Sequence, residues 1–576
     1  MFSEANSLYE LWLNKATADK DLIKELKSIS SDENEIYERF YKELEFGTAG
    51  LRGIIGAGTN RMNVYTVGKT TQGLANYLNS KYENPSVAIS YDSRIKANVF
   101  AKECASVLAA NGITAYITRS LQPVPLLSFC VRDLNCSAGI MITASHNPAE
   151  YNGYKCYGPD GCQMTDSDAG CVYDQITNVD IFEDVKRVDF QDGLKKGLIK
   201  YIDCSIYDKY LSNVQAQSIN PDICSDSDLK VVYTPLNGTG NKFVRKTLGN
   251  IGIKKVVVVP EQERPDGNFP TCKYPNPEFK EALELALKLA EKENPDLILA
   301  TDPDCDRVGI AVKDGDNFRL MTGNETGILL LNYILSCRAK NGNLPQNPIA
   351  IKTIVSSPMI DKICENYNCE LRNVLTGFKY IGEQILGLEK SNETNRFIFG
   401  FEESYGYLVG SYVRDKDAVV ASMLICEMAA YYKKQDKTLI QVIEELYEEY
   451  GYYLSKTLNF AFEGAAGMEK MTALMDDLRE NPPEIIADFI VVNMADYLTS
   501  EAFDIENYSS KRINLPKSNV LEYGLEDGLK VIIRPSGTEP KIKVYITCVG
   551  ETQEDAKEKL DSISEFMNDL INNSNN

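Results

Sequence analysis

The chain has 576 residues, 43% of them hydrophobic, and a formal net charge of −22 at pH 7. This length exceeds what a single hydrophobic core accommodates, so we expect several domains. The negative charge argues against nucleic acid and anionic membranes as partners, and no segment stays apolar for the roughly 20 residues that a membrane-spanning helix needs.

The cysteines and the N-terminal segment bear on the cellular compartment. The first residues, MFSEANSLYELWLNKATADKD, lack the basic and apolar regions of a secretory signal. The 15 cysteines are scattered without a C-x-x-C pair, and a single histidine accompanies them. This usage is typical of reduced thiols, and it favours neither a disulfide framework nor a zinc site. We therefore predict a cytoplasmic protein, and the sequence leaves its oligomeric state open.

After a helical N-terminus, the chain alternates between short apolar runs and helical segments. The runs PSVAISYD, ITAYIT and SAGIMIT are separated by the helical stretches NVFAKECASVLAANG and LLSFCVRDL. Strands that alternate with helices predict βαβ units and a mostly parallel sheet. The same order recurs over residues 229–313 and 348–401. We therefore predict an α/β fold with three similar units, each built on a mixed sheet.

The last part of the chain has a different pattern. LKVIIRPSGTEPKIKVYITCV reads as two strands around a turn, and TQEDAKEKLDSISEFMNDLIN reads as a closing amphipathic helix. We expect a C-terminal α+β domain after the three α/β units. The predicted domain ranges are 1–205, 206–320, 321–450 and 451–576.

Each of the three similar units places a polar loop directly after a buried apolar strand. These loops are TASHNP at 143–148, TDPDCDR at 301–307 and GFEESYGY at 400–407. Open α/β sheets bind ligands at the carboxyl ends of their strands, so these loops are candidate binding segments.

The acidic loop TDPDCDR is a candidate metal site. Asp302, Asp304 and Asp306 alternate in sequence, so an extended backbone would place their carboxylates on one side, where they repel unless a cation lies among them. Oxygen ligands favour Mg²⁺, and an EF-hand is excluded because Arg307 and Lys313 occupy the positions that need glycine and glutamate. The alternative is a solvated acidic turn. Three protein ligands leave positions open for water or a substrate phosphate, which indicates phosphoryl chemistry.

The segment RPSGTEPK near the C-terminus has the composition of an anion site. Arg534 can donate a fork of hydrogen bonds to phosphate, Ser536 and Thr538 supply hydroxyl donors, and Gly537 lets the backbone come close. The alternative is an ordinary turn between two strands, because Pro-Ser-Gly is a common turn composition.

The loop GFEESYGY has the groups that sugar hydroxyls bind. Glu402 and Glu403 offer carboxylate acceptors beside Ser404. The alternative is a charged loop with aromatic contacts, and by itself this signal is weak.

The loop TASHNP contains Ser145 and the only histidine, His146. Adjacent residues seldom reach the geometry of a nucleophile and its base, and Ser145 lacks the flanking glycines of a G-x-S-x-G elbow. A hydrolase is therefore disfavoured, and His146 is more often a structural hydrogen-bonding residue than a catalyst.

In this order, TASHNPAEYNGYK, TDPDCDR, GFEESYGY and RPSGTEPKIK resemble the α-D-phosphohexomutase superfamily, whose members have four domains. The match spans nearly the whole chain. EFGTAGLRGIIGAGTNRMN at 45–63 and TGFKYIG at 376–382 are similar to the branch of phosphoglucomutases and phosphopentomutases of the FGTAGLR type. The resemblance implies four domains around one central cleft.

The resemblance also implies roles for single residues. Ser145 would carry a phosphoryl group that completes a Mg²⁺ site with Asp302, Asp304 and Asp306. Arg52 would stabilise the transferred group, Lys155 would act as general base, and His146 would support the serine. The remaining predicted contacts to substrate are Arg307, Thr376, Gly377, Lys379, Glu402, Glu403, Ser404, Arg534, Ser536, Gly537 and Thr538.

The implied activity is that of a phosphoglucomutase. Such an enzyme interconverts glucose 1-phosphate and glucose 6-phosphate through phosphoserine, with glucose 1,6-bisphosphate as intermediate and activator. A phosphopentomutase and a sugar bisphosphate synthase stay open as alternatives, because the motif loops do not separate them. A noncatalytic phosphosugar-binding protein is the alternative of a different class, and intact Ser145, Lys155 and Arg52 argue against it.

Overall fold

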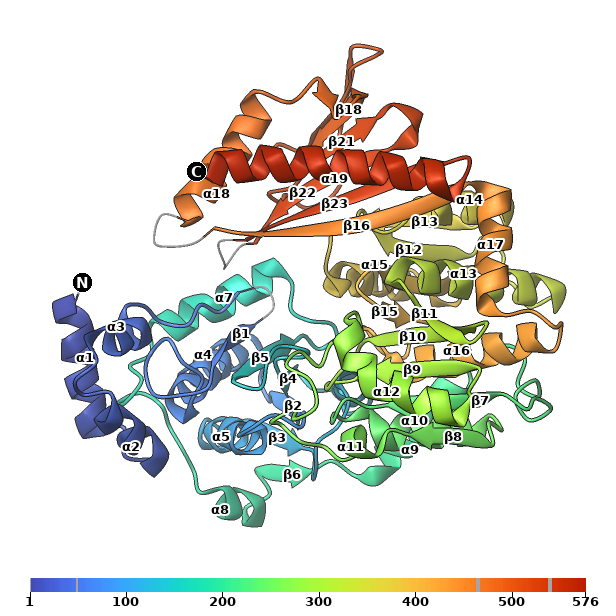
Figure 1. Ribbon diagram of the computed structural model, residues 1–576. Coiled ribbons are helices and arrows are strands. Elements are labelled where there is room, and N and C mark those ends of the chain that lie inside the picture. Colours follow the sequence, from blue (N-terminus) through green and yellow to red (C-terminus); the bar gives the residue numbers. More distant parts are fainter. Residues whose placement is uncertain (1, 48–49, 463–466, 537–540, 576) are drawn as a thin grey trace.

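A computed structural model describes residues 2–47, 50–462, 467–536 and 541–575. The chain forms four sheets in sequence order (Figure 1). Among the described helices, none is both long enough and apolar enough to cross a membrane. The cysteines are free thiols, and most of them are buried.

Three N-terminal helices precede the first sheet and pack on its helices. They are α1 (Phe2–Lys15), α2 (Lys20–Ser28) and α3 (Glu33–Phe40). Trp12 is fully buried among them and contacts the rings of Phe40 and Tyr65 edge to face. Buried aromatic area of this kind is a large source of stability, so it attaches this segment firmly to the first unit.

The first sheet has the strand order β1-β5-β4-β2-β3-β6. Strands β4, β2, β3 and β6 are parallel, and β5 and β1 add antiparallel pairs at one edge. The strands are β1 (Leu51–Ile54), β2 (Ser86–Tyr91), β3 (Thr114–Ile117), β4 (Ala138–Ile142), β5 (Tyr151–Tyr157) and β6 (Ile199–Tyr201). The helices are α4 (Val64–Lys81), α5 (Ala97–Ala110), α6 (Val124–Asp133), α7 (Asp166–Thr177) and α8 (Phe190–Lys195).

The second sheet has the order β11-β10-β9-β7-β8, in which β7, β8 and β9 are parallel. The strands are β7 (Lys230–Thr234), β8 (Lys255–Val258), β9 (Leu297–Thr301), β10 (Val308–Asp314) and β11 (Asn317–Met321). The helices of this unit are α9 (Cys204–Gln215), α10 (Gly240–Asn250), α11 (Pro260–Glu263) and α12 (Lys280–Glu293).

The third sheet has the order β13-β12-β14-β15, in which β12, β13 and β14 are parallel. The strands are β12 (Ile349–Thr353), β13 (Glu370–Val374), β14 (Phe397–Glu402) and β15 (Gly406–Leu408). The helical elements are α13 (Gly323–Lys340), α14 (Met359–Asn366), α15 (Phe378–Lys390), η1 (Thr394–Arg396), α16 (Ala418–Lys433) and α17 (Leu439–Tyr450).

These three sheets share one topology, which confirms the prediction of three similar units. The common order is β3-β2-β4-β5 in the first, β8-β7-β9-β10 in the second and β13-β12-β14-β15 in the third. In each, the last strand runs antiparallel to its neighbour. The three polar loops therefore occupy one equivalent position, the connection into that antiparallel strand.

The fourth sheet is antiparallel, with the order β16-β23-β22-β21-β18-β19-β20 and β17 beside β18. The predicted strand pair and closing helix are confirmed as β22, β23 and α19. The elements are β16 (Tyr452–Ala461), α18 (Gly467–Glu480), β17 (Ile485–Ile486), β18 (Phe489–Asp496), β19 (Glu501–Asp504), β20 (Ser509–Arg512), β21 (Leu521–Leu525), η2 (Glu526–Gly528), β22 (Lys530–Pro535), β23 (Lys541–Gly550) and α19 (Gln553–Asn575).

The units are joined by packed apolar surface. One large cluster of buried residues runs through the first three units, from Leu126 through Leu297 to Ile349. The fourth unit has its own core, and a smaller cluster that includes Ile354, Leu375 and Tyr545 joins it to the third. The four sheets follow the predicted domain order, and the domain boundaries themselves stay predictions.

Candidate functional site

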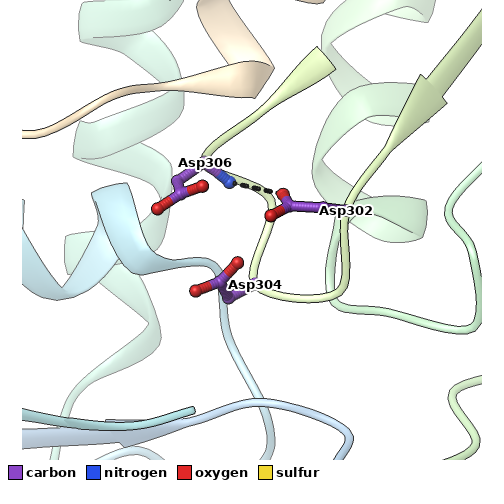
Figure 2. Close-up of side chains that lie close together, drawn as sticks. All are labelled: Asp302, Asp304 and Asp306. Carbon is purple, nitrogen blue, oxygen red and sulfur yellow. Dashed lines mark hydrogen bonds between the residues drawn. The ribbon is translucent and has the colours of Figure 1, made fainter. Parts of the chain in front are cut away.

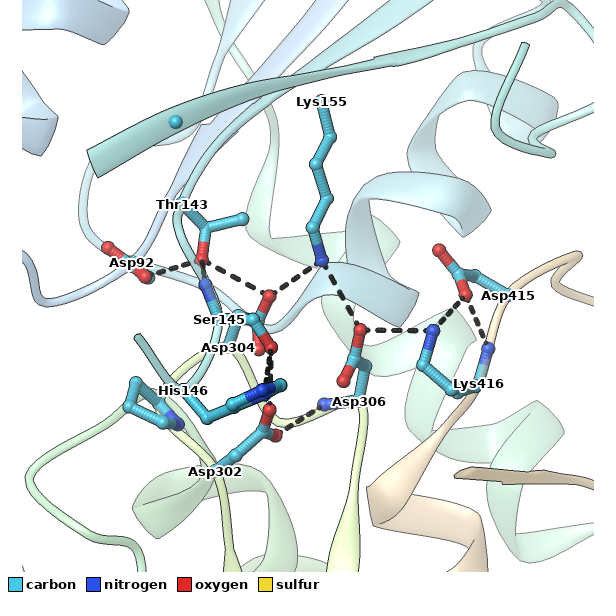
Figure 3. A network of polar contacts seen from close by, with 12 residues as sticks. Asp92, Thr143, Ser145, His146, Lys155, Asp302, Asp304, Asp306, Asp415 and Lys416 are labelled. Carbon is cyan, nitrogen blue, oxygen red and sulfur yellow. Dashed lines mark hydrogen bonds and ion pairs between the residues drawn. The ribbon is translucent and has the colours of Figure 1, made fainter. Parts of the chain in front are cut away.

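The loop after β4, the loop after β9 and the segment before α16 meet at one point (Figure 3). The carboxyl ends of parallel strands lie at one edge of a sheet, so the shared topology directs both loops outward from equivalent edges. Figure 3 shows Ser145, Lys155 and the three aspartates within one polar network.

Asp302, Asp304 and Asp306 are buried, and carboxylate oxygens from all three lie within 4.8 Å of one another (Figure 2). Their convergence was predicted from extended backbone, and that reason is wrong, because a tight turn brings them together. Within it, Cys305 has a φ of 57°, and Asp302 Oδ1 accepts hydrogen bonds from the backbone N–H of Asp306 at 3.1 Å and of Arg307 at 3.0 Å.

The pKa values of Asp302 and Asp306 shift in opposite directions. Burial and then the charges of Asp304 and Asp306 raise the pKa of Asp302 well above its usual range. Burial by itself would raise the pKa of Asp306, but Lys416, Lys155 and Arg307 outweigh it and hold this pKa below the ordinary value. Burial and the neighbouring carboxylates therefore disfavour a negative charge on Asp302.

This arrangement fits a hard divalent cation. Asp304 Oδ1 and Asp306 Oδ1 are buried and accept no hydrogen bond from the described residues. A buried acceptor without a donor is costly, and a cation bound by oxygen ligands would remove both that cost and the repulsion. The residues present thus support a metal site.

Ser145 is held with its hydroxyl toward the aspartates. Ser145 is 3% exposed and has a φ of 52°, a left-handed conformation that non-glycine residues seldom adopt. Its N–H donates to Thr143 Oγ1 at 2.8 Å, and its Oγ donates to Asp302 Oδ2 at 2.9 Å. The serine oxygen is therefore next to the candidate metal ligands.

His146 lies beside the serine, with its Nδ1 3.3 Å from Ser145 Oγ. Burial and then the charges of Arg307 and Arg52 hold the pKa of His146 well below its usual range. A neutral imidazole among these cations can orient the serine hydroxyl, and the supporting role of His146 stays a prediction.

Two lysines from different units, one on β5 and one just before α16, contact the acidic loop (Figure 3). Lys155 Nζ, on β5, donates to Asp304 Oδ2 at 2.9 Å and to Asp306 Oδ2 at 3.3 Å. Lys416 Nζ lies 3.3 Å from the same Asp306 oxygen and 3.0 Å from Asp415 Oδ1. Burial by itself would lower the pKa of Lys155, but Asp304 and Asp306 outweigh it, so the pKa is raised and Lys155 holds its proton in this arrangement.

The two predicted arginines flank the serine loop and the acidic loop. Arg52, on β1, donates to Asn147 Oδ1 at 3.1 Å. Arg307 lies at the end of the acidic loop and donates to Glu278 Oε1 at 3.2 Å. The charges of both arginines lower the pKa of His146, so they place positive charge around the serine.

The predicted sugar loop is held at the end of β14. Glu402 Oε1 accepts the backbone N–H of Gly377 at 2.8 Å, and Glu403 Oε2 accepts from Thr353 Oγ1 at 3.1 Å. Burial raises the pKa of Glu402, and burial and then the charge of Glu402 raise the pKa of Glu403 to about 7. Ser404 follows directly and is partly buried. These contacts bring the TGFKYIG segment, including Thr376, next to the sugar loop.

The other residues predicted to contact substrate are Lys379 on α15 and the RPSGTEPK segment of the fourth unit. Lys379, on α15, pairs with Asp166 at the start of α7, so it bridges the first and third units. Its contact with substrate stays a prediction. Arg534 and Ser536 lie at the end of β22 and beyond it, and Ser536 N–H donates to Lys541 O at 2.7 Å. Gly537 and Thr538 lie outside the described residues.

The structure adds residues that the sequence reasoning missed. Asp92 and Arg94 follow β2 and contact the serine loop, and Thr143 contacts both Asp92 and Asp304. A polar residue after a buried strand was the signal used for the other loops, and YDSR after SVAISY carries it too. Lys416 has no such signal, because it precedes a helix.

Comparison with known protein families gives a match to each of the four units. The phosphoglucomutase/phosphomannomutase family models match in order: alpha/beta/alpha domain I over residues 43–181, domain II over 208–315, domain III over 322–450 and the C-terminal domain over 469–563.

Curated relatives extend this match to full length. A phosphoglucomutase from Staphylococcus aureus strain USA300 is 38% identical over 556 residues, which cover 96% of this chain and 98% of that protein. A phosphoglucomutase from strain MW2 is 37% identical over the same length.

Solved structures agree on the fold. A phosphoglucomutase/phosphomannomutase family protein from Burkholderia thailandensis has a TM-score of 0.64 at 17% identity, covering 91% of this chain and 97% of that one. The open form of pp63/parafusin from Paramecium has a TM-score of 0.68 at 18% identity, covering 92% and 96%.

Proposed function

The chain belongs to the phosphoglucomutase/phosphomannomutase family of the α-D-phosphohexomutase superfamily, and on this basis we propose that it is a phosphoglucomutase. Family membership makes it an isomerase that acts by phosphoryl transfer on small phosphosugars. The finer proposal is that it interconverts glucose 1-phosphate and glucose 6-phosphate through phosphoserine at Ser145. Its full-length relatives, named phosphoglucomutases, support glucose as the sugar.

The observation that carries the proposal is the position of the serine hydroxyl. Ser145 Oγ lies 2.9 Å from Asp302, next to three buried carboxylates that need a cation. A serine placed for hydrolysis would need a base and an oxyanion site, whereas a serine beside a metal site is placed to carry phosphate. Asp302, Asp304 and Asp306 would hold Mg²⁺ together with the phosphoryl group on Ser145.

Phosphoryl transfer then follows from the groups present. The phosphoryl group leaves Ser145 Oγ for the free hydroxyl of a sugar monophosphate, so one O–P bond breaks as another forms. The product, glucose 1,6-bisphosphate, turns end for end and returns its other phosphoryl group to Ser145. Arg52 and Arg307 offer positive charge to the transferred group, because such reactions depend mainly on positioning and charge stabilisation.

The attacking hydroxyl must lose its proton, and we assign this step to Lys155. Mg²⁺ bound to the aspartates would stabilise charge on the phosphoryl group and neutralise the carboxylates that hold the Lys155 proton. With those carboxylates neutralised, Lys155 would lose the attraction that raises its pKa and could accept the hydroxyl proton. It returns this proton to Ser145 Oγ when the phosphoryl group leaves the serine.

The two ends of the sugar would be bound by different units. Glu402, Glu403 and Ser404 would accept or donate hydrogen bonds to sugar hydroxyls, and the RPSGTEPK segment would bind the phosphate that is not transferred. Holding both ends lets the enzyme present either phosphate of the bisphosphate to the same serine.

Replacing Ser145 by alanine tests the proposal. We expect Ser145→Ala to abolish turnover of glucose 1-phosphate in a coupled assay, while Ser106→Ala, a buried serine on α5, stays active. Incubation of the wild-type protein with glucose 1,6-bisphosphate should place a phosphate on Ser145, as read by intact mass and peptide mapping. Turnover by Ser145→Ala would refute the serine relay, and faster turnover of ribose 1-phosphate than of glucose 1-phosphate would identify a phosphopentomutase instead.

A further inference from the structure

The backbone of the Ser145 loop is held by one buried side chain outside the predicted site. The side chain of Arg94 is fully buried, and its guanidinium donates to four backbone carbonyl oxygens of this loop and of the first residue of β5. Nη1 donates to Pro148 O and Tyr151 O, each at 2.8 Å. Nη2 donates to Ser145 O at 2.6 Å and to Asn147 O. Each N–H of the two terminal nitrogens therefore has its own acceptor.

Arg94 is itself fixed in place by its surroundings. Asp92 Oδ2 lies 3.5 Å from Arg94 Nε, and Asp92 Oδ1 accepts the backbone N–H of Arg94 at 2.9 Å. The ring of Phe269, from the second unit, lies 5.1 Å from the guanidinium carbon. The backbone of Arg94 also pairs with Gly267, so Arg94 connects the serine loop to the unit that carries the aspartates.

The pair Asp92–Arg94 controls both polar groups of the Ser145 backbone. The carbonyl oxygen of Ser145 accepts a hydrogen bond from Arg94. The N–H of Ser145 donates to Thr143 Oγ1, which lies 2.6 Å from Asp92 Oδ2. Ser145 has a left-handed φ of 52°, a strained conformation for a residue with a Cβ that persists only where neighbours enforce it. A different φ would turn Oγ away from Asp302.

We propose that Arg94, anchored by Asp92, is a positioning residue for phosphoryl transfer, because it holds the Ser145 loop in the backbone conformation that directs Oγ at the aspartates. This inference rests on the proposed serine relay. Arg94 does not donate to the reacting oxygen, so it acts through the loop. A lysine could not replace it, because one ammonium group cannot reach four carbonyls that surround a planar fork.

The variant Arg94→Lys tests this role, with Arg479→Lys as the matched control. Arg479, in the fourth unit, is also mostly buried, and its guanidinium binds Asp496 and the carbonyl of Met475. We expect Arg94→Lys to lower kcat about 100-fold, the loss that a misplacement of about 1 Å produces. KM should change little, since a fully buried side chain does not meet the sugar. Arg479→Lys should keep wild-type kcat.

Two further readouts separate positioning from general destabilisation. Hydrogen exchange of the backbone amides of residues 143–152 should be faster in Arg94→Lys and unchanged in Arg479→Lys. The rate at which glucose 1,6-bisphosphate phosphorylates Ser145 should fall in parallel with kcat. Wild-type kcat, unchanged exchange, or an equal loss in Arg479→Lys would overturn the inference. If Arg94→Lys does not fold, Asp92→Asn keeps the shape of the anchor, and a lower kcat with faster exchange of the same amides is the expected result.

The outcome for the wild-type protein separates this inference from the proposed function. If wild-type Ser145 takes up no phosphate, the serine relay fails and the inference falls with it. If wild-type Ser145 is phosphorylated and Arg94→Lys is phosphorylated at the same rate, the relay holds and only the positioning role is refuted.

Discussion

Replacing Glu403 by glutamine should remove a pH dependence of stability that this one carboxyl group creates. Burial and then the charge of Glu402 raise the pKa of Glu403 from 4.5 to about 7 in the folded protein. The folded state therefore keeps a proton that the unfolded state has lost between these two pH values. Ionisation of Glu403 thus destabilises the fold as pH rises from about 4.5, and the whole loss is reached above about 7.

The size of this loss follows from the two pKa values. One pKa unit corresponds to about 1.4 kcal/mol, so the interval from 4.5 to about 7 corresponds to at most roughly 3–4 kcal/mol. The true loss is smaller because the side chain is only partly buried and solvent screens it. Glu403→Gln keeps an acceptor for the hydroxyl of Thr353 and cannot ionise.

The assay is the apparent Tm of the wild type and of Glu403→Gln between pH 5 and pH 8.5, with Glu448→Gln on the exposed face of α17 as control. We expect the variant to match the wild type near pH 5 and to be more stable at pH 8. The control should keep the wild-type slope. Parallel curves for the wild type and Glu403→Gln would refute the reasoning, because they would show that Glu403 ionises without cost.

Three other changes have defined expected outcomes. Mg²⁺ at 100 times its Kd should raise the stability of the wild type by about 2.7 kcal/mol, seen as a higher apparent Tm. Asp304→Asn should lose this rise in Tm, whereas Asp314→Asn, which changes an exposed aspartate of the same unit, should keep it. A rise retained by Asp304→Asn would argue against the metal site. Lys155→Met should lower kcat by about 10²- to 10⁴-fold in steady-state assays, whereas Lys81→Met on α4 should not, and equal activity would exclude Lys155 as the base. Gly73→Ala should destabilise the protein by about 1–3 kcal/mol in thermal unfolding, because the added carbon would lie 2.4 Å from Ile176 Cγ1. Gly170→Ala places its added carbon in open space and should leave the stability unchanged. A gain of stability in Gly73→Ala would contradict the packing of α4 on α7.

The sequence alone predicted the three similar units because the signal is local. Runs such as AGIMI and LILAT are almost entirely apolar, as strands covered on both faces are, and helical stretches separate them. The same locality explains the predicted loops, since TASHNP and TDPDCDR each follow such a strand. A polar loop after a buried strand is visible without knowing where the strand lies in space.

The motif resemblance contributed what local patterns do not contain. Ser145 and Lys155 were named together because they match a family pattern, and nothing in the spacing of ten residues predicts that both reach the aspartates. In the fold they do so because β4 and β5 pair antiparallel and direct both side chains toward the loop after β9.

Only the tertiary structure decided which groups surround the serine and with what charge. Lys416 and Glu278 come from segments with no sequence signal that relates them to Ser145, and they meet the site because three separate sheets pack with equivalent edges together. The raised pKa of Lys155 has the same origin, since proton affinity depends on burial and on charges that arrive from other units. The amino-acid order thus determines the strands, the helices and the chemistry that each loop offers, whereas the contacts between loops depend on how the units pack.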